Sequence, residues 1–109
     1  MAAKTKAKPS MTEDQLLAAI REYATLKKWL CYHTRDSRRS EPGFPDLVLT
    51  RGGRLIFAEL KKEGEYPTKE QRKWLLQLDK VANNWNESVD AYVWYPSDWL
   101  SGKIEEVLR

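Results

Sequence analysis

Two acidic residues and a lysine interrupt two hydrophobic stretches in the middle of the sequence. Asp46 begins "DLVLT", and Glu59 follows thirteen positions later in "RLIFAELKK", two positions before Lys61. Burying a charged side chain is costly unless the charge is paired, so three charges in otherwise apolar segments need a reason. Acidic oxygens and a lysine gathered at one point can form an ion pair or hold a divalent cation.

The spacing of the two acids translates into a geometry, because the two stretches are typical of a β-hairpin. Strands are predicted at about 46–51 and 54–61, joined by the diglycine at 52–53, which favours a two-residue turn. With that turn, residues whose numbers sum to 105 face each other across the hairpin. Asp46 and Glu59 meet this condition, so their Cβ atoms should lie roughly 4.5–5.5 Å apart on one face.

Two carboxylates at that separation repel each other, and something must offset the repulsion. Lys61 shares their face and can do so as a structural ion pair. A divalent cation does so more fully, because two carboxylates and the Leu60 carbonyl form an all-oxygen site suited to Mg²⁺ or Mn²⁺. Such a half-open site also leaves room for water and a phosphate oxygen. The residues alone leave both interpretations open.

Two further polar residues stand at the head of apolar helical stripes. Glu13 precedes apolar residues of a predicted first helix by three, four and seven positions, and Gln71 has the same relation to a second helix. Both side chains can therefore project toward the sheet. Helix capping is the simpler alternative, since acids favour a first turn and Gln71 can bond back to Thr68.

The elements that position these residues follow an α-β-β-β-α-β-α order. The sequence predicts a helix from Thr12, a strand at 29–34, the two hairpin strands, a helix from Thr68, a strand at 89–96 and a short closing helix interrupted near Gly102. The fold class is therefore α/β, with a small mixed sheet flanked by helices. Residues expected to face inward are Leu16, Leu17, Ile20 and Ala24 in the first long helix, and Trp74, Leu75, Leu78, Val81 and Ala82 in the second.

Composition limits the classes of protein to consider. A chain of 109 residues, 41% of them hydrophobic, suits a single domain, placed at 12–109 after a flexible basic tail at 1–11. One Cys and one His exclude a disulfide framework and a Cys/His zinc cluster. No apolar run approaches the roughly 18 residues of a membrane span, so we expect no membrane contact. We also expect a cytoplasmic protein that uses no small-molecule cofactor.

Positive charge is concentrated in the first third of the chain. Residues 1–39 hold nine Lys or Arg and four Asp or Glu, whereas 40–109 hold ten and twelve. A basic segment suits a polyanionic partner, although a solvated tail and an exposed loop explain the same charges. The candidate contacts in this segment are Lys4, Lys6, Lys8, Arg35, Arg38 and Arg39, and Lys62 is a further candidate outside it.

The single histidine and single cysteine lie close together in "WLCYHT". A nucleophilic pair of Cys31 and His33 is not expected, because residues two apart on a strand lack a visible orienting carboxylate. Cys31 is most simply a small buried residue. His33 is either a packed strand residue or an outlying contact of the site.

The charged motif resembles that of a known nuclease family. Pro45-Asp46 followed by Glu59-Leu60-Lys61 is similar to the PD-(D/E)XK signature, and "YHTRDSRRSEPGFPDLVLTRGGRLIFAELKKEGEYPTKEQRKWL" resembles the VRR-NUC branch, the virus-type replication and repair nucleases, in the stand-alone form common in phages and prophages. The resemblance extends from "TEDQLLAAI" to "VWYPSDWL". It implies a restriction-endonuclease-like core and hydrolysis of DNA that depends on Mg²⁺ or Mn²⁺.

The resemblance also implies roles for individual residues. Asp46 and Glu59 would bind the metal with the Leu60 carbonyl, and Lys61 would position or activate the attacking water. Glu13 matches the acid of the family's first helix, as a further ligand directly, through water or to a second ion. Gln71 matches the glutamine of the helix that follows the motif.

Substrate and assembly are likewise implied by the resemblance. Stand-alone members resemble Holliday-junction resolvases that act as homodimers, so we expect branched DNA, a homodimer and, for a phage-encoded protein, the host cytoplasm. A flap or end-processing nuclease and a non-cleaving DNA-binding subunit are the alternatives. Four of the five tryptophans either line a two-fold interface or pack inside: Trp29, Trp85, Trp94 and Trp99.

Overall fold

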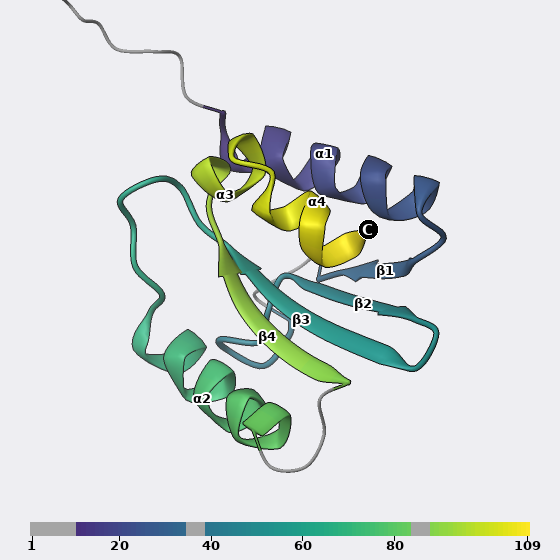
Figure 1. The fold of residues 1–109 in the computed structure, drawn as a ribbon. Coiled ribbons are helices and arrows are strands. Elements are labelled where there is room, and N and C mark those ends of the chain that lie inside the picture. The colour runs from purple at the N-terminus through teal and green to yellow at the C-terminus, as the bar shows by residue number, and fades with distance from the viewer. Residues whose placement is uncertain (1–10, 35–38, 84–87) are drawn as a thin grey trace, which may run out of the picture.

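The computed structural model describes residues 11–34, 39–83 and 88–109 of the chain. They form a four-stranded β-sheet with helices on both faces (Figure 1). The elements in chain order are α1 (Glu13–Leu26), β1 (Leu30–His33), β2 (Leu47–Arg51), β3 (Arg54–Leu60), α2 (Lys69–Asn83), β4 (Val89–Trp94), α3 (Pro96–Leu100) and α4 (Lys103–Leu108). The predicted order is confirmed, and the closing helix is divided in two at Gly102.

The sheet is mixed, as the sequence predicts. β1, β2 and β3 are antiparallel neighbours, whereas β4 lies beside β3 and runs parallel to it. A parallel neighbour requires a crossover connection, and α2 provides it on the face opposite α1, α3 and α4 (Figure 1). This α/β arrangement is consistent with a restriction-endonuclease-like core.

The hydrophobic core lies between the sheet and the layer that contains α1 and α4. α1 buries Leu16, Ile20 and Ala24 completely, at the spacing of one helical face. Alternate residues of the central strands meet that face; the fully buried ones are Leu47, Leu49, Ile56 and Ala58. Because side chains alternate along a strand, the residues between them belong to the second face, on the side of α2.

The second face is covered less completely than the sequence predicts. Trp74, Leu75 and Leu78 of α2 are half-buried, but Val81 is 47% exposed, so the prediction that Val81 faces inward is wrong. The physical reason is the position of the helix. α2 packs mainly against β4, which is an edge strand, so the apolar stripe of the helix is wider than the sheet surface beneath it.

The helices begin at the predicted caps and are short. The Thr12 hydroxyl accepts a hydrogen bond from the Gln15 N–H (3.1 Å), and the Gln15 side chain accepts one from the Thr12 N–H (2.9 Å), which completes a capping box. α2 is the longest helix of the described residues, at 15 residues. No helix in this part of the chain has the length and apolar composition needed to cross a membrane.

The β2–β3 hairpin has the predicted register. Leu47 pairs with Ala58 and Arg51 with Arg54, which leaves the diglycine at 52–53 as the turn. Both glycines have positive φ angles, 56° and 85°, as a type I′ turn requires. The register places Asp46 and Glu59 opposite each other, one position beyond the last pair.

Two arginines hold the turn end of this hairpin against the ends of α1 and α4. The Arg51 and Arg54 guanidinium groups lie 4.5 Å and 5.2 Å from the ring centroid of Trp29. Both groups also donate to backbone carbonyls at 2.9–3.4 Å, and the Trp29 indole N–H donates to another at 2.9 Å. The accepting carbonyls belong to Lys27, Val107, Leu108 and Arg109. This cluster is structural, because each cation has protein partners.

Candidate active site

The opposite end of the hairpin, here called the open end, carries Asp46, Glu59 and Lys61. Asp46 lies just before β2, and its Oδ2 accepts a hydrogen bond from the Leu60 N–H at 2.9 Å. This bond holds the aspartate against the last residues of β3. The two acids therefore converge at one end of the two central strands, as the register of the hairpin predicts.

Glu59 is the buried charge of this end. The residue is only 2% exposed. Its Oε2 accepts a hydrogen bond from the Gln71 side-chain amide at 2.6 Å and lies 3.7 Å from the Lys61 ammonium. Its Oε1 is buried and has no hydrogen-bond partner among the described residues. The described residues thus stabilise one oxygen of this buried carboxylate by a hydrogen bond and leave the other without one.

Burial makes the ionised form of Glu59 expensive. Desolvation, and next the neighbouring Asp46 carboxylate, raise the pKa of Glu59 from its ordinary 4.5 to about 8, although the Lys61 ammonium acts in the opposite direction. Lys61 is itself largely buried, with 14% of its side chain exposed. One lysine therefore offsets only part of the unfavourable charge at the open end.

Gln71 both caps α2 and projects toward the sheet, which are the two possibilities that the sequence left open. Its Oε1 accepts from the Thr68 N–H at 2.7 Å, and its own N–H donates to the Thr68 hydroxyl at 3.2 Å, so it caps α2. Its Nε2 donates to Glu59. An amide has an acceptor end and a donor end, and here they connect the start of α2 to the buried carboxylate.

A glycine brings the preceding loop against the start of α2. Gly43 has a φ of +87°, and a Cβ there would lie 2.4 Å from the carbonyl carbon of Glu70 and 2.7 Å from the Gln71 nitrogen. The next residue, Phe44, packs edge-to-face on Phe57 and Trp74, with ring centroids 6.2 Å and 5.1 Å apart. No pattern in the sequence predicts this contact; the only local signal is the pair Gly43-Phe44 between two prolines in "PGFP".

Glu13 borders the same end from the first turn of α1. Partial burial raises the pKa of Glu13, and the next largest effects come from Asp46, which raises it, and Lys61, which lowers it. Glu65 raises it as well, which adds a nearby acid that the sequence analysis did not select. Within the described ranges, however, no three His, Cys, Asp or Glu side chains are close enough to form a metal-binding group. Asp46 is the charged neighbour that raises the pKa of Glu59 most.

Comparison with known proteins decides the family. A scan against protein families matches the VRR-NUC domain over residues 4–93 of the 109-residue chain. The chain belongs to the VRR-NUC family. A search of curated proteins and a search of solved structures gave no significant match. Family membership implies a nuclease of the virus-type replication and repair class, with DNA as its substrate.

The other predicted site residues of this VRR-NUC domain are spread over its surface. Arg39 and Lys62 are exposed, on the loop before β2 and the loop after β3. His33 is half-buried and pairs with Leu47, so it belongs to the core face of β1, opposite the acids. Burial raises the pKa of the Cys31 thiol, which disfavours a thiolate nucleophile. Five predicted DNA contacts lie outside the described residues: Lys4, Lys6, Lys8, Arg35 and Arg38.

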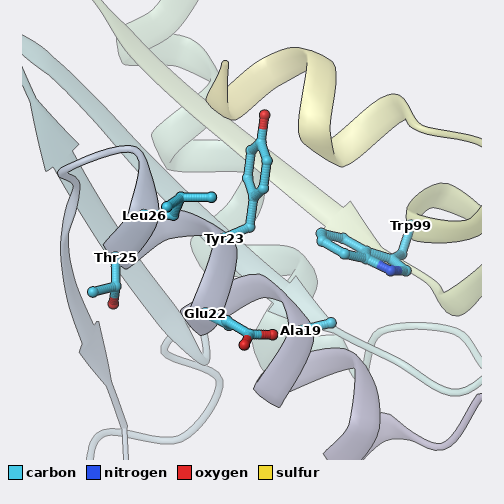
Figure 2. A pocket seen from close by; sticks show the side chains of 6 residues that line it. All are labelled: Ala19, Glu22, Tyr23, Thr25, Leu26 and Trp99. Atoms are coloured by element: carbon cyan, nitrogen blue, oxygen red, sulfur yellow. The ribbon is translucent and has the colours of Figure 1, made fainter.

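The VRR-NUC domain has a separate apolar hollow on the other face of the sheet, shown in Figure 2. Side chains from the C-terminal half of α1 and Trp99 of α3 line it, and the Tyr23 and Trp99 rings pack edge-to-face at 6.1 Å.

The core of a single chain accounts for Trp29 and Trp94, which are each 4% exposed. Trp99 is half-buried, and Trp85 lies outside the described residues.

Proposed function

We propose that this VRR-NUC protein is a DNA endonuclease that depends on Mg²⁺ or Mn²⁺ and acts at the open end of the β2–β3 hairpin. The single observation that carries the proposal is a buried Glu59 oxygen that has no hydrogen-bond partner in the described part of the chain and lies close to the Asp46 carboxylate. A buried polar atom without a partner is rare in a folded protein and needs a physical explanation. A cation bound between the two acids supplies one.

The donor set fits a hard divalent cation. Asp46 and Glu59 offer carboxylate oxygens, and the Leu60 carbonyl stands between Glu59 and Lys61 in the chain. Oxygen ligands of this kind are those that Mg²⁺ and Mn²⁺ prefer. The raised pKa of Glu59 agrees with this assignment, because a cation would stabilise the ionised form that burial and Asp46 disfavour. When bound, such an ion provides Lewis acidity and charge neutralisation for phosphodiester hydrolysis.

The chain's own residues would orient the reaction around that pair. Lys61 provides a positive charge beside Glu59, placed to hold the attacking water or a phosphate oxygen. Gln71 fixes the orientation of the Glu59 carboxylate by its 2.6 Å hydrogen bond. Glu13 lies close enough to interact electrostatically with Asp46 and Lys61, and we assign it to water or a second ion instead of the first ion.

For the substrate and the assembly we propose branched DNA and a homodimer acting in the cytoplasm. A four-way junction offers two equivalent strands, and each chain contains one Asp46–Glu59 pair, so a two-fold dimer would present two sites. Phosphate contacts by Arg39, Lys62 and the basic residues outside the described ranges would make binding weaken steeply with salt. Light scattering that returned a mass near the monomer's 12.8 kDa would contradict the dimer.

The deciding experiment is a cleavage panel. Four-way junction, flap, fork and linear duplex are incubated with Mg²⁺, with Mn²⁺ and with EDTA, using the wild type and Asp46→Asn. We expect metal-dependent cutting, fastest on a branched substrate, that Asp46→Asn abolishes. Asp90→Asn is the matched control, because it makes the same change at a carboxylate of β4 that lies 3.9 Å from the Arg54 guanidinium, away from the open end. Cleavage by Asp46→Asn at the wild-type rate would refute the assignment, and fastest cutting of the flap would favour the end-processing alternative.

A further inference from the structure

Each flank of the proposed catalytic end carries an exposed aromatic side chain. Tyr66, in the loop that follows β3, is 82% exposed, and Tyr32 of β1 is 62% exposed. A tyrosine ring supplies a large flat surface for contact, and these two rings bury little of that surface within the chain.

The sheet places Tyr32 on the same face as the acids. Tyr32 pairs with Val48, and Val48 stands two positions from Asp46, so the three side chains share the second face. α2 packs mainly against β4 at the other edge of the sheet, and the β1 part of this face is not covered by it. The exposure of Leu30 at 75%, two positions from Tyr32 on the same strand, agrees with an uncovered face.

The loop that carries Tyr66 is anchored on both sides of that residue. The Tyr95 hydroxyl donates to the Glu65 carbonyl at 2.7 Å, and the Arg72 guanidinium donates to the Pro67 carbonyl at 2.6 Å. The Glu63 carboxylate accepts hydrogen bonds from the Ser97 N–H at 2.8 Å and from the Ser97 hydroxyl at 3.1 Å. The backbone is thus fixed before and after Tyr66 while its ring stays in solvent.

The order of the elements puts the acids between the two rings. Tyr32 is on β1, Asp46 leads into β2, and Glu59 is the last residue but one of β3. The loop of Tyr66 is hydrogen-bonded to the segment that follows β4. β1 and β3 are two interstrand spacings apart, about 10 Å. A DNA strand whose phosphate lies at the acids can therefore extend over one tyrosine on each side.

We propose that Tyr32 and Tyr66 stack on unpaired bases of the substrate on the two sides of the cleaved phosphate. The inference rests on the proposed nuclease function and names its substrate class: DNA whose bases next to the cut are not paired. Stacking on an aromatic ring is available to every base, so it selects exposed bases without selecting sequence. Bases inside an intact duplex are already stacked and cannot use it.

Binding tests the inference independently of cleavage. Fluorescence anisotropy in EDTA, at one fixed salt concentration, compares a short oligothymidine with an abasic oligomer of the same length and charge. We expect the wild type to bind the base-containing strand more tightly, by about five- to 100-fold for each stacked base. The double variant Tyr32→Ala/Tyr66→Ala should lose most of this preference, while its affinity for the abasic strand stays as in the wild type.

Two controls separate stacking from general damage. Tyr32→Phe/Tyr66→Phe keeps both rings and should keep the preference, and Leu100→Ala removes an exposed apolar side chain from α3, 69% exposed, without effect. An unchanged preference in the double alanine variant would overturn the inference, as would an equal loss for the abasic strand. If the wild type binds unpaired bases but cuts nothing in the panel with metal, the nuclease proposal fails, and the two tyrosines then serve binding of unpaired DNA alone.

Discussion

The two ends of the β2–β3 hairpin both collect charge, but they satisfy it differently. At the turn end, Arg51 and Arg54 lie over Trp29 and donate to carbonyls at the ends of α1 and α4. At the open end, Glu59 is buried beside Asp46 and one of its oxygens has no partner among the described residues. Both ends carry charges, so what distinguishes the structural cluster from the proposed reactive one is whether protein partners neutralise those charges.

The largest effect should come from neutralising the buried acid. Glu59→Gln keeps the shape of the side chain but removes its charge, and we expect cleavage to fall by about a thousandfold or more. The same change should stabilise the metal-free protein at pH 8, because glutamine has no charge to bury. Opposite signs for activity and stability are the signature of a site that is incomplete without its ligand.

The direction of the pKa shift of Glu59 determines whether the stability of the protein rises or falls with pH. The folded protein raises the pKa of Glu59 from 4.5 to about 8, so its proton is held more tightly than in the unfolded chain. The associated stability is fully present below pH 4.5 and is lost as the pH rises through about 8. In EDTA, the advantage of Glu59→Gln at pH 8 should be on the order of a few kcal/mol, since one pKa unit corresponds to about 1.4 kcal/mol. Thermal unfolding at several pH values measures it, and an advantage that grows toward low pH would contradict the account.

Gln71 provides the next largest test, because it links the acid to a helix cap. Gln71→Ala should lower kcat/KM by about 10- to 100-fold, as expected for a residue that orients a metal ligand, and should weaken Mn²⁺ binding by a similar factor. The loss of the cap should cost about 1 kcal/mol of stability in addition. Gln77→Ala, at an exposed position of the same helix, is the matched control. A Gln71 variant that lost stability alone would reduce this residue to a cap.

Gly43 tests whether the loop before Asp46 sets the position of α2. A methyl group there would meet the backbone of Glu70 at 2.4 Å, and the φ of +87° disfavours any side chain. Gly43→Ala should therefore cost about 1–3 kcal/mol in the free energy of unfolding. It should also lower Mn²⁺ affinity, since the start of α2 carries Gln71. Chemical denaturation and metal titration on the same sample separate the two effects, and wild-type values for both would show that the loop adjusts freely.

The turn end should respond in the opposite manner. Arg51→Ala removes hydrogen bonds to the ends of α1 and α4 and a contact with Trp29. We expect a loss of about 1.5–3 kcal/mol in the free energy of unfolding and no change in kcat/KM of the folded protein. Urea denaturation and initial rates measure these quantities. A selective fall in kcat/KM at full stability would remove the distinction between the two ends.

The sequence predicts the open end well because its geometry depends on short-range rules. A two-residue diglycine turn and the alternation of strand side chains determine that Asp46 faces Glu59, and a helical stripe indicates that Glu13 points toward the sheet. The roles given to these residues stay predictions. The register that brings the acids together is confirmed.

The rest depends on contacts between distant segments, which no local pattern encodes. The residues around Gly43 do not predict its contact with Glu70, and the residues around Arg51 do not predict that α4 ends beside that arginine. The exposure of Val81 arises for the same reason, since a helical stripe does not show how wide the surface beneath it will be. Local periodicity thus gives the face of an element but not the extent of its partner.

Calorimetric titration of MnCl₂ into the metal-free protein measures whether the Asp46–Glu59 pair binds a divalent cation. We expect saturable uptake by the wild type and by Asp90→Asn, and its loss in Asp46→Asn and in Glu59→Gln. Absence of uptake by the wild type, or uptake that survives both substitutions at the open end, would contradict the proposal of a divalent-cation site at this pair.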